Sequence, residues 1–301
     1  MKYLIIGGNS YAAQNAIKAI RQYNENAEII ASTSTSSPIE SADHTLFEID
    51  LNSANAVSKV VEDCNSMGIQ DIEWLIYTPA FGRVGIPIDR STAEDVQGSI
   101  NFSFRPMLEL MERLQPKNAM CFSGYYWLES LLRAYGAMAL TKIAMEQTAI
   151  RFPEKIKVVR SGLFPSKSLR GILLLIQRTL MKDTYEELRP LYISWKDSGK
   201  KFADYFYDFA YNCEKEMLDE KSLDFRPTTG EDIQKAIIQF FEGETAPIVN
   251  TMAGHTWTDN TMPDLPGVLV RNQNLIPNDL YTYFKEEASG VEVSDLQKKK
   301  A

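Results

Sequence analysis

Short apolar runs alternate along the chain with segments of helical periodicity, and this alternation constrains the fold more than any other feature. The apolar runs cover residues 3–8, 27–33, 44–51, 72–80, 118–124 and 156–162, and a seventh follows at 246–252. Runs without regular polar positions are typical of strands buried on both faces, as in a parallel sheet covered by helices. The alternation therefore predicts an α/β fold with a doubly wound, parallel, seven-stranded sheet.

The segments between these runs have the spacing of amphipathic helices. Ala13, Ala16, Ile17 and Ile20 recur on one helical face directly after the first apolar run. Further helices are expected at 55–64, at 92–114 and through Lys142 to residue 152. Each helix is therefore expected to pack one apolar face onto the sheet.

The connection between the sixth and seventh strands is unusually long. Residues 167–226 contain one apolar and two aromatic-rich helical runs. By themselves these helices can cover the sheet or form a subunit interface. A chain of 301 residues can form one domain with such an embellishment. The predicted organisation is a single domain over 1–285 that contains the helical insertion at 167–226, and a solvated tail at 286–301.

Charge and composition exclude several functions. The net charge of −8 opposes binding to nucleic acid or to an anionic membrane, which needs clustered Lys and Arg. Three well-separated cysteines and two histidines give no metal-site or disulfide pattern. No apolar run reaches the length of a membrane span. The expectation is a soluble, cytoplasmic protein without a metal.

The turn after the first strand is a candidate nucleotide site, because ligands of doubly wound folds bind at the carboxyl ends of the strands. Glycines here permit a tight turn, and the following helix N-terminus can face phosphates. A glycine turn without a ligand is an equally good interpretation. The candidate residues are Gly7, Gly8, Asn9, Ser10, Tyr11 and Ala12.

Polar or small residues also follow later strands. Asp50, with Leu51 beside it, can accept a hydrogen bond from an adenine amino group, or it can cap the next helix. The stretch of Thr78, Pro79 and Ala80 leaves room for a ribose, or it is a plain turn. Ser123 and Tyr125 stand at the end of the fifth strand and are candidates for the reacting centre.

Tyr135 and Lys142 are the candidate acid–base pair. Many oxidoreductases place a tyrosine four residues before a lysine, but here Met138 has that position. Seven residues are nearly two helical turns, so the pair would share a face of one continuous helix, with Cα atoms roughly 10 Å apart. Both side chains would then reach one cavity.

In their order, these features resemble the short-chain dehydrogenase/reductase superfamily, whose members have a Rossmann fold. The Tyr-x6-Lys spacing of Tyr135 and Lys142, with Tyr125 ten positions earlier, resembles the enoyl-acyl-carrier-protein reductases of that superfamily. The departures are Ala12 and Gln14, which stand where the second and third glycines of the turn are expected. The resemblance covers residues 1–166 and about 227–255.

The resemblance implies roles for the candidate residues. Lys142 would bind the nicotinamide ribose and favour tyrosinate, and Tyr135 would donate a proton or hydrogen bond to the substrate oxygen. Asn101 would hold a relay water or bend its helix. The stretch 160–166 would frame the nicotinamide, and the insertion at 167–226 would be an enlarged substrate lid. The residues assigned to the frame are Gly162, Leu163 and Ser166.

The cofactor implied is NAD or NADP. The second strand ends near Ser32 in a run of Ser and Thr. This run contains no Asp or Glu to bind the free ribose 2′-hydroxyl of NAD and no Arg or Lys to bind the 2′-phosphate of NADP, so either cofactor is possible. The expected function is hydride transfer to an enoyl thioester or a carbonyl of a hydrophobic, small-molecule or acyl substrate, by a homo-oligomer that is a dimer or tetramer. The alternative is a non-catalytic dinucleotide-binding sensor or scaffold.

Overall fold

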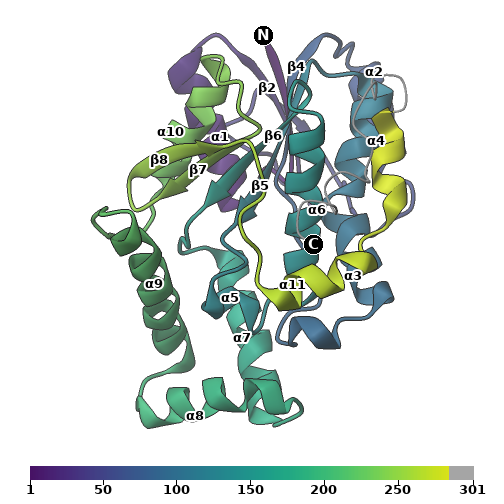
Figure 1. Cartoon of the computed structure of the whole chain (residues 1–301). Helices are drawn as coiled ribbons and strands as arrows, with labels where there is room; N and C mark the ends of the chain where they lie inside the picture. The colour runs from purple at the N-terminus through teal and green to yellow at the C-terminus, as the bar shows by residue number, and fades with distance from the viewer. Residues whose placement is uncertain (285–301) are drawn as a thin grey trace, which may run out of the picture.

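The computed structural model describes residues 1–284, in which one twisted sheet carries helices on both faces (Figure 1). The tail expected at 286–301 lies outside the described residues. The strands are β1 (Lys2–Ile6), β2 (Glu28–Ser32), β3 (His44–Leu46), β4 (Ile72–Tyr77), β5 (Asn118–Gly124), β6 (Ile156–Ser161), β7 (Ile248–Met252) and β8 (His255–Asp259). Their order across the sheet is β3-β2-β1-β4-β5-β6-β7-β8.

The predicted doubly wound parallel sheet is confirmed, and only its strand count was wrong. Neighbouring strands from β3 to β7 are parallel, whereas β8 pairs antiparallel with β7. Ala253 (φ 55°) and Gly254 (φ 91°) form the two-residue turn of this hairpin. The third strand is shorter than the predicted 44–51, because it ends at Leu46 and Glu48 already has a positive φ of 57°.

Helices cover the two faces of the sheet as separate layers (Figure 1). On one face, α1 (Tyr11–Tyr23) packs beside α10 (Gly230–Phe241), and the four residues of the predicted α1 face are buried. The other face carries α2 (Ala56–Ser66), α3 (Ala93–Ser103), α4 (Arg105–Leu114) and α6 (Ala137–Arg151). The sheet thus lies between two apolar cores.

The helix predicted at 92–114 is broken into α3 and α4. Phe104 stands between them with φ −141° and ψ −47°, outside the helical region. Pro106 lies in the first turn of α4, where its missing N–H costs no hydrogen bond. The proline therefore fits the start of a second helix and not the interior of one long helix.

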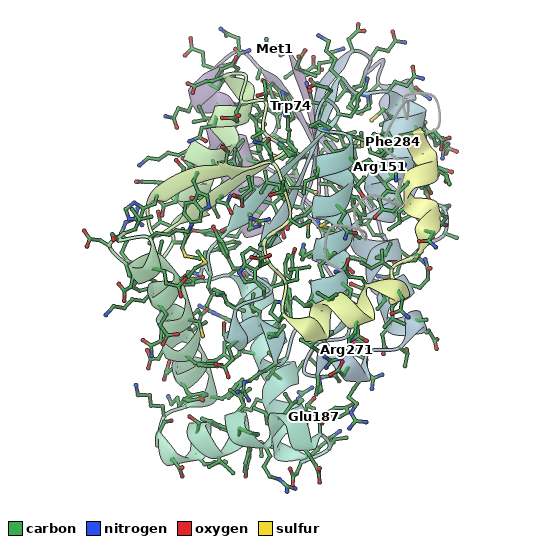
Figure 2. All side chains as sticks on the ribbon, viewed as in Figure 1. Met1, Trp74, Arg151, Glu187, Arg271 and Phe284 are labelled. Carbon is green, nitrogen blue, oxygen red and sulfur yellow. The ribbon has the colours of Figure 1, made fainter. Side chains whose placement is uncertain are left out.

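The last described segments lie along the α6 face. They comprise α11 (Gly267–Asn272), η3 (Gln273–Leu275) and η4 (Asn278–Phe284). The ring of Phe284 is 4.2 Å from that of Phe152, and the guanidinium of Arg151 lies 5.1 Å from the centre of the Tyr281 ring. Figure 2 labels Phe284 and Arg151. These contacts attach the end of the described chain to α6.

The helices that follow β6, up to but not including α10, form an arm beyond the carboxyl ends of the strands, at the bottom of Figure 1. The arm comprises α7 (Lys167–Met181), η2 (Glu186–Leu188), α8 (Arg189–Asp197) and α9 (Phe202–Glu220). It has its own apolar cluster, which includes Leu173, Trp195 and Phe206. Within residues 1–284, none of the helices is both long and apolar enough to cross a bilayer.

Candidate active site

A cavity of about 640 Å³ lies where the carboxyl ends of the strands meet the helical arm. Nearly all of the predicted site residues line it. Those lining residues are Gly7, Asn9, Ser10, Tyr11, Ala12, Ser32, Asp50, Leu51, Thr78, Pro79, Ala80, Ser123, Tyr125, Tyr135, Lys142, Gly162, Leu163 and Ser166. Residues that are far apart in the sequence are therefore brought to one site.

The glycine turn packs closely on the neighbouring strand ends. Gly7 has φ +81°, and a Cβ atom there would lie 2.8 Å from Thr78 Oγ1. Gly8 does not line the cavity. A Cβ atom there would lie 2.3 Å from Ile39 Cδ1, so this glycine is required for packing beneath the turn. Both positions need glycine, for different steric reasons.

Gln14 explains how the turn tolerates the loss of its third glycine. Its side-chain amide donates a 2.7 Å hydrogen bond to the carbonyl oxygen of Gly8. The residue that departs from the glycine pattern thus stabilises the turn from the side of α1. Ser10 caps this helix by accepting from the amide of Ala13 at 3.0 Å, and the remaining first-turn amides have no partner within the helix.

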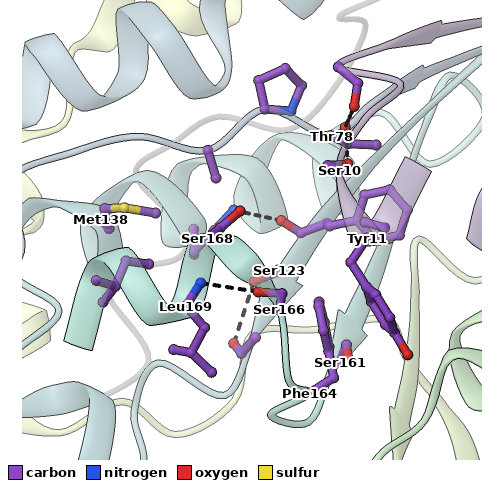
Figure 3. A pocket seen from close by; sticks show the side chains of 18 of the residues that line it. Ser10, Tyr11, Thr78, Ser123, Met138, Ser161, Phe164, Ser166, Ser168 and Leu169 are labelled. Carbon is purple, nitrogen blue, oxygen red and sulfur yellow. Dashed lines mark hydrogen bonds between the residues drawn. The ribbon is translucent and has the colours of Figure 1, made fainter. Parts of the chain in front are cut away.

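Hydroxyl and amide groups connect the first, second and fourth strands at the cavity wall. Ser10 donates to Thr78 Oγ1 at 2.8 Å, a bond visible in Figure 3, and the same threonine oxygen donates to the carbonyl of residue 6 at 2.9 Å. Ser32 Oγ accepts from the amide of Gly7, and Asn9 Nδ2 donates to Thr33 Oγ1. These bonds fix the strand ends relative to one another.

Asp50 is exposed at the edge of the cavity. Its carboxylate accepts hydrogen bonds from the main-chain and side-chain nitrogens of Asn52, and these bonds hold the pKa of Asp50 below its ordinary value. The N-cap of α2 is Asn55, so the alternative role of Asp50 as a cap of that helix was wrong. The carboxylate remains ionised and accessible to a ligand.

Tyr135 and Lys142 both line the cavity, although they do not lie on one helix. The chain turns at Gly136, whose φ of +54° precedes the first residue of α6, and a Cβ atom there would lie 2.7 Å from the carbonyl oxygen of Arg83. The expectation of a continuous helix between the pair was therefore wrong. Tyr135 instead forms an isolated parallel bridge with Ile86.

Burial changes the acidity of both groups. It raises the pKa of Tyr135 to about 12, and the hydroxyl has no hydrogen-bond partner among residues 1–284. Burial lowers the pKa of Lys142 to about 8, against the opposing effects of Cys121 and Glu146. Near neutral pH the site therefore contains a protonated phenol and an ammonium group.

Tyr125 and Ser123 occupy the end of β5 differently. Ser123 lines the cavity with only a long 3.5 Å contact to the carbonyl of Gly124. The Tyr125 hydroxyl donates a 3.2 Å bond to Asn250 Oδ1 and so joins a buried network behind the cavity. Ser123 is thus the freer of the two hydroxyls.

Asn101 is not brought to the cavity. It is exposed on α3, where its Oδ1 accepts from Gln97 at 2.6 Å and from Arg105 at 3.0 Å. It lies near the end of α3, which stops at Ser103, and its side chain is on the solvent-exposed face of the helix. It could hold a relay water only if the helix were reoriented.

The sequence predicted a lid at 167–226 but did not identify the residues of the arm that line the cavity. The part of the cavity that they line is mainly apolar and includes Leu169, Ile172, Ile176, Phe206 and Ala210. The sequence signal was the apolar helical pattern of 167–181, which does not reveal whether one face lines a cavity. The carboxyl group of Glu214 also lines this part and had no signal at all.

An aromatic pair joins two walls of the cavity. Tyr11, at the start of α1, stacks on Phe164, which follows β6 (Figure 3). The ring centroids are 5.0 Å apart and the planes are inclined by 22°. The pair thus connects the glycine turn to the start of the arm.

The order of the strands, the glycine turn and the cavity at their carboxyl ends define a Rossmann-type α/β fold. No protein-family model matches the chain, and no curated protein matches its sequence. Comparison with solved structures nevertheless identifies the fold more closely: the chain has a divergent form of the short-chain dehydrogenase/reductase fold.

Three solved structures illustrate this likeness. Pseudomonas aeruginosa RhlG, in an active-site complex with NADP, is 11% identical over 84% of this chain and 95% of its own, with a TM-score of 0.55. An enoyl-(acyl-carrier-protein) reductase from Anaplasma phagocytophilum in complex with NAD is 16% identical over 84% and 92%, with a TM-score of 0.56. A short-chain dehydrogenase from Streptomyces avermitilis is 12% identical over 91% of both chains, with a TM-score of 0.50.

Proposed function

We propose that the chain is an NAD(P)-dependent oxidoreductase of the short-chain dehydrogenase/reductase type. The observation that carries the proposal is one cavity that joins the glycine turn, the polar strand ends, Tyr135 and Lys142. The complexes of RhlG with NADP and of the Anaplasma phagocytophilum reductase with NAD, which share the fold, support a dinucleotide as the ligand.

The residues present fit such a cofactor. Gly7 lines the cavity beside the N-terminus of α1, whose first amides have no partner within the helix, and such a helix N-terminus can receive a diphosphate. Asp50 would accept from the adenine amino group, and Lys142 would bind the nicotinamide ribose. When bound, the dinucleotide supplies the hydride.

Tyr135 supplies the proton in this proposal. Its raised pKa keeps the phenol protonated until a substrate oxygen gains negative charge. The ammonium of Lys142, still protonated at neutral pH, favours both the developing oxyanion and the tyrosinate that remains. Met138 is buried at the cavity wall and excludes water from this region.

The arm provides the proposed substrate lid. Its apolar residues suit a hydrophobic or acyl substrate, which would bury the same side chains. The spacing of Tyr135 and Lys142 favours an enoyl thioester, while the free hydroxyl of Ser123 favours a carbonyl. Assembly into dimers or tetramers and a cytoplasmic location remain predictions.

Titration of the purified chain with NADH and NADPH, followed by nucleotide fluorescence, tests the binding half of the proposal. Turnover of enoyl and carbonyl substrates of increasing chain length tests the rest. Tyr135→Phe should keep nucleotide affinity and lose reductase activity by about a hundredfold or more, since acid catalysis contributes on that scale. Tyr23→Phe, an exposed tyrosine on α1, is the matched control.

A non-catalytic dinucleotide-binding sensor or scaffold is the second candidate. It is favoured by the engagement of the Tyr125 hydroxyl with Asn250 and by the loss of two glycines from the turn. Both candidate functions predict nucleotide binding, so turnover of an enoyl or carbonyl substrate distinguishes between them. Nucleotide binding without reduction of any substrate by the wild-type protein would favour the sensor.

A further inference from the structure

Glu214 is a buried carboxyl group at the cavity wall that the proposed mechanism does not use. It lies on α9 of the arm, is 4% exposed and is among the residues that line the cavity. The other carboxylate that lines the cavity, Asp50, is exposed near the glycine turn. Glu214 is therefore an acidic side chain in the mainly apolar end of the cavity.

One oxygen of Glu214 has a partner and the other has none. Oε1 accepts a short hydrogen bond from the main-chain amide of Leu163, whereas Oε2 is buried without a hydrogen-bond partner in the described chain. A buried polar atom without a partner destabilises the folded state, and most buried polar atoms in native proteins have a hydrogen-bond partner. The free oxygen is thus a vacant acceptor position.

The surroundings of Glu214 raise its pKa. Burial raises the pKa of this carboxyl to about 7, and the hydrogen bond from Leu163 only partly opposes that effect. Within residues 1–284, the titratable groups that interact with it are Tyr125, which directly follows β5, and Tyr211 of α9, and neither is a cation at neutral pH. The carboxyl group is therefore divided between its neutral and ionised forms near pH 7.

Its position is next to the chain that follows β6. A Cβ atom on Gly162 would lie 3.2 Å from Glu214 Oε1, so no side chain separates the carboxyl from the main chain there. Gly162 and Leu163 line the cavity and belong to the stretch that would frame the nicotinamide. The nicotinamide end of a dinucleotide carries a carboxamide, whose NH₂ group is a hydrogen-bond donor.

Building on the proposed function, we propose that Glu214 is a further cofactor-binding residue, whose free carboxylate oxygen accepts a hydrogen bond from the carboxamide of the nicotinamide. An ionised carboxylate only accepts, so it matches the NH₂ donor. Binding would supply the missing partner and connect the arm to the cofactor. It would also favour the ionised form, so that the protein releases a proton when the dinucleotide binds.

The sign of the pH dependence follows. Below the pKa of Glu214 the carboxyl is protonated in the free protein, and the dinucleotide must displace that proton. Affinity should therefore decrease as the pH falls below 7, by at most about tenfold for each pH unit. Above pH 7 this contribution levels off, because the carboxyl is already ionised.

Calorimetric titration with NADH at about pH 5.5 and about pH 7.5, each in two buffers of different ionisation enthalpy, measures affinity and proton release together. The wild-type protein should bind more tightly at the higher pH and release a proton at the lower one. Glu214→Gln should lose both effects. Its Kd at the higher pH should be about tenfold higher, because the NH₂ group of glutamine would face the NH₂ group of the carboxamide, and two donors form no hydrogen bond. Glu216→Gln, an exposed position on the same helix, should behave as wild type.

Three outcomes are decisive. NADH binding with unchanged pH dependence and proton release in Glu214→Gln would overturn the role of Glu214 and leave the proposed function standing. Binding to wild type without any proton release would do the same, and that measurement needs no variant. Failure of wild type to bind either NADH or NADPH at both pH values would overturn the proposed function together with this inference.

Discussion

The ammonium group of Lys142 donates a 2.7 Å hydrogen bond to the main-chain carbonyl oxygen of Phe122, which connects α6 to the end of β5 beside Ser123. The lysine is only 5% exposed and lies at the cavity wall, and no carboxylate of residues 1–284 is in hydrogen-bond contact with its ammonium group. This bond to a main-chain carbonyl only partly replaces the lost water, so burial remains the largest influence and lowers the pKa of Lys142.

The rate of NADH or NADPH oxidation should therefore fall as the pH rises through about 8. Below that value Lys142 is protonated and assists Tyr135, and above it the positive charge is lost. Lys142→Arg keeps a charge that does not titrate in this range, so its profile should stay flat to higher pH. A pH–rate profile of both proteins checks the assignment, which is contradicted if the wild-type profile does not bend near pH 8.

NADH should bind about tenfold or more tightly than NADPH. A 2′-phosphate would enter a cavity that, among the described residues, is lined by no arginine and by one lysine, Lys142. Ser34, exposed at the cavity edge after β2, offers a hydroxyl but no charge. Ser34→Arg should raise NADPH affinity selectively, whereas the more distant Ser37→Arg should not. Equal affinity of the wild-type protein for both nucleotides would refute this preference.

The sequence predicted regular elements well and local backbone reversals poorly. The predicted strand at 118–124 agrees with β5 at both ends, because its apolar run stops at glycine. The turn at Gly136 was missed, since Ala, Met and Leu around it favour a helix and only tertiary contact with Arg83 shows why the chain reverses there. Strand β8 was missed because its alternating polar residues resemble a loop.

The same distinction between regular elements and tertiary packing applies to the site residues. Residues at strand ends could be found, because a parallel sheet brings its carboxyl edges together whatever the details of packing. Glu214 could not, because its burial depends on how α9 folds back over Gly162. Asn101 was predicted from its place in the order of motifs, which does not reveal that its helix presents it to solvent.

The stacked pair of Tyr11 and Phe164 should slow the release of a bound dinucleotide, because it joins the glycine turn to the start of the arm across the cavity. An aromatic pair contributes about 0.5–1.5 kcal/mol, so Tyr11→Ala should raise the NADH dissociation rate roughly threefold to tenfold. Stopped-flow fluorescence of the two single variants and the double variant measures the coupling. Strictly additive effects would show that the pair does not act as a unit.

The ion pair between Arg160 and Glu146 should dominate the stability of the region behind the cavity. Arg160 donates to both oxygens of Glu146, at 3.0 and 2.7 Å, with the two side chains 1% and 0% exposed. Tyr126 donates to the same carboxylate at 2.7 Å, and Asn250 accepts from Arg160 at 2.9 Å. Removal of one charge would leave the other buried with too few partners.

Glu146→Gln should therefore lower the free energy of unfolding by about 3–5 kcal/mol, reduced to the extent that Asp259, which also pairs with Arg160, compensates. Glu129→Gln is the matched control, because it breaks an exposed pair with Arg133 and should cost less than about 1 kcal/mol. Urea unfolding followed by circular dichroism measures both variants. Equal urea midpoints for the two variants would contradict the prediction, because the buried pair of Arg160 and Glu146 would then contribute no more to stability than the exposed pair.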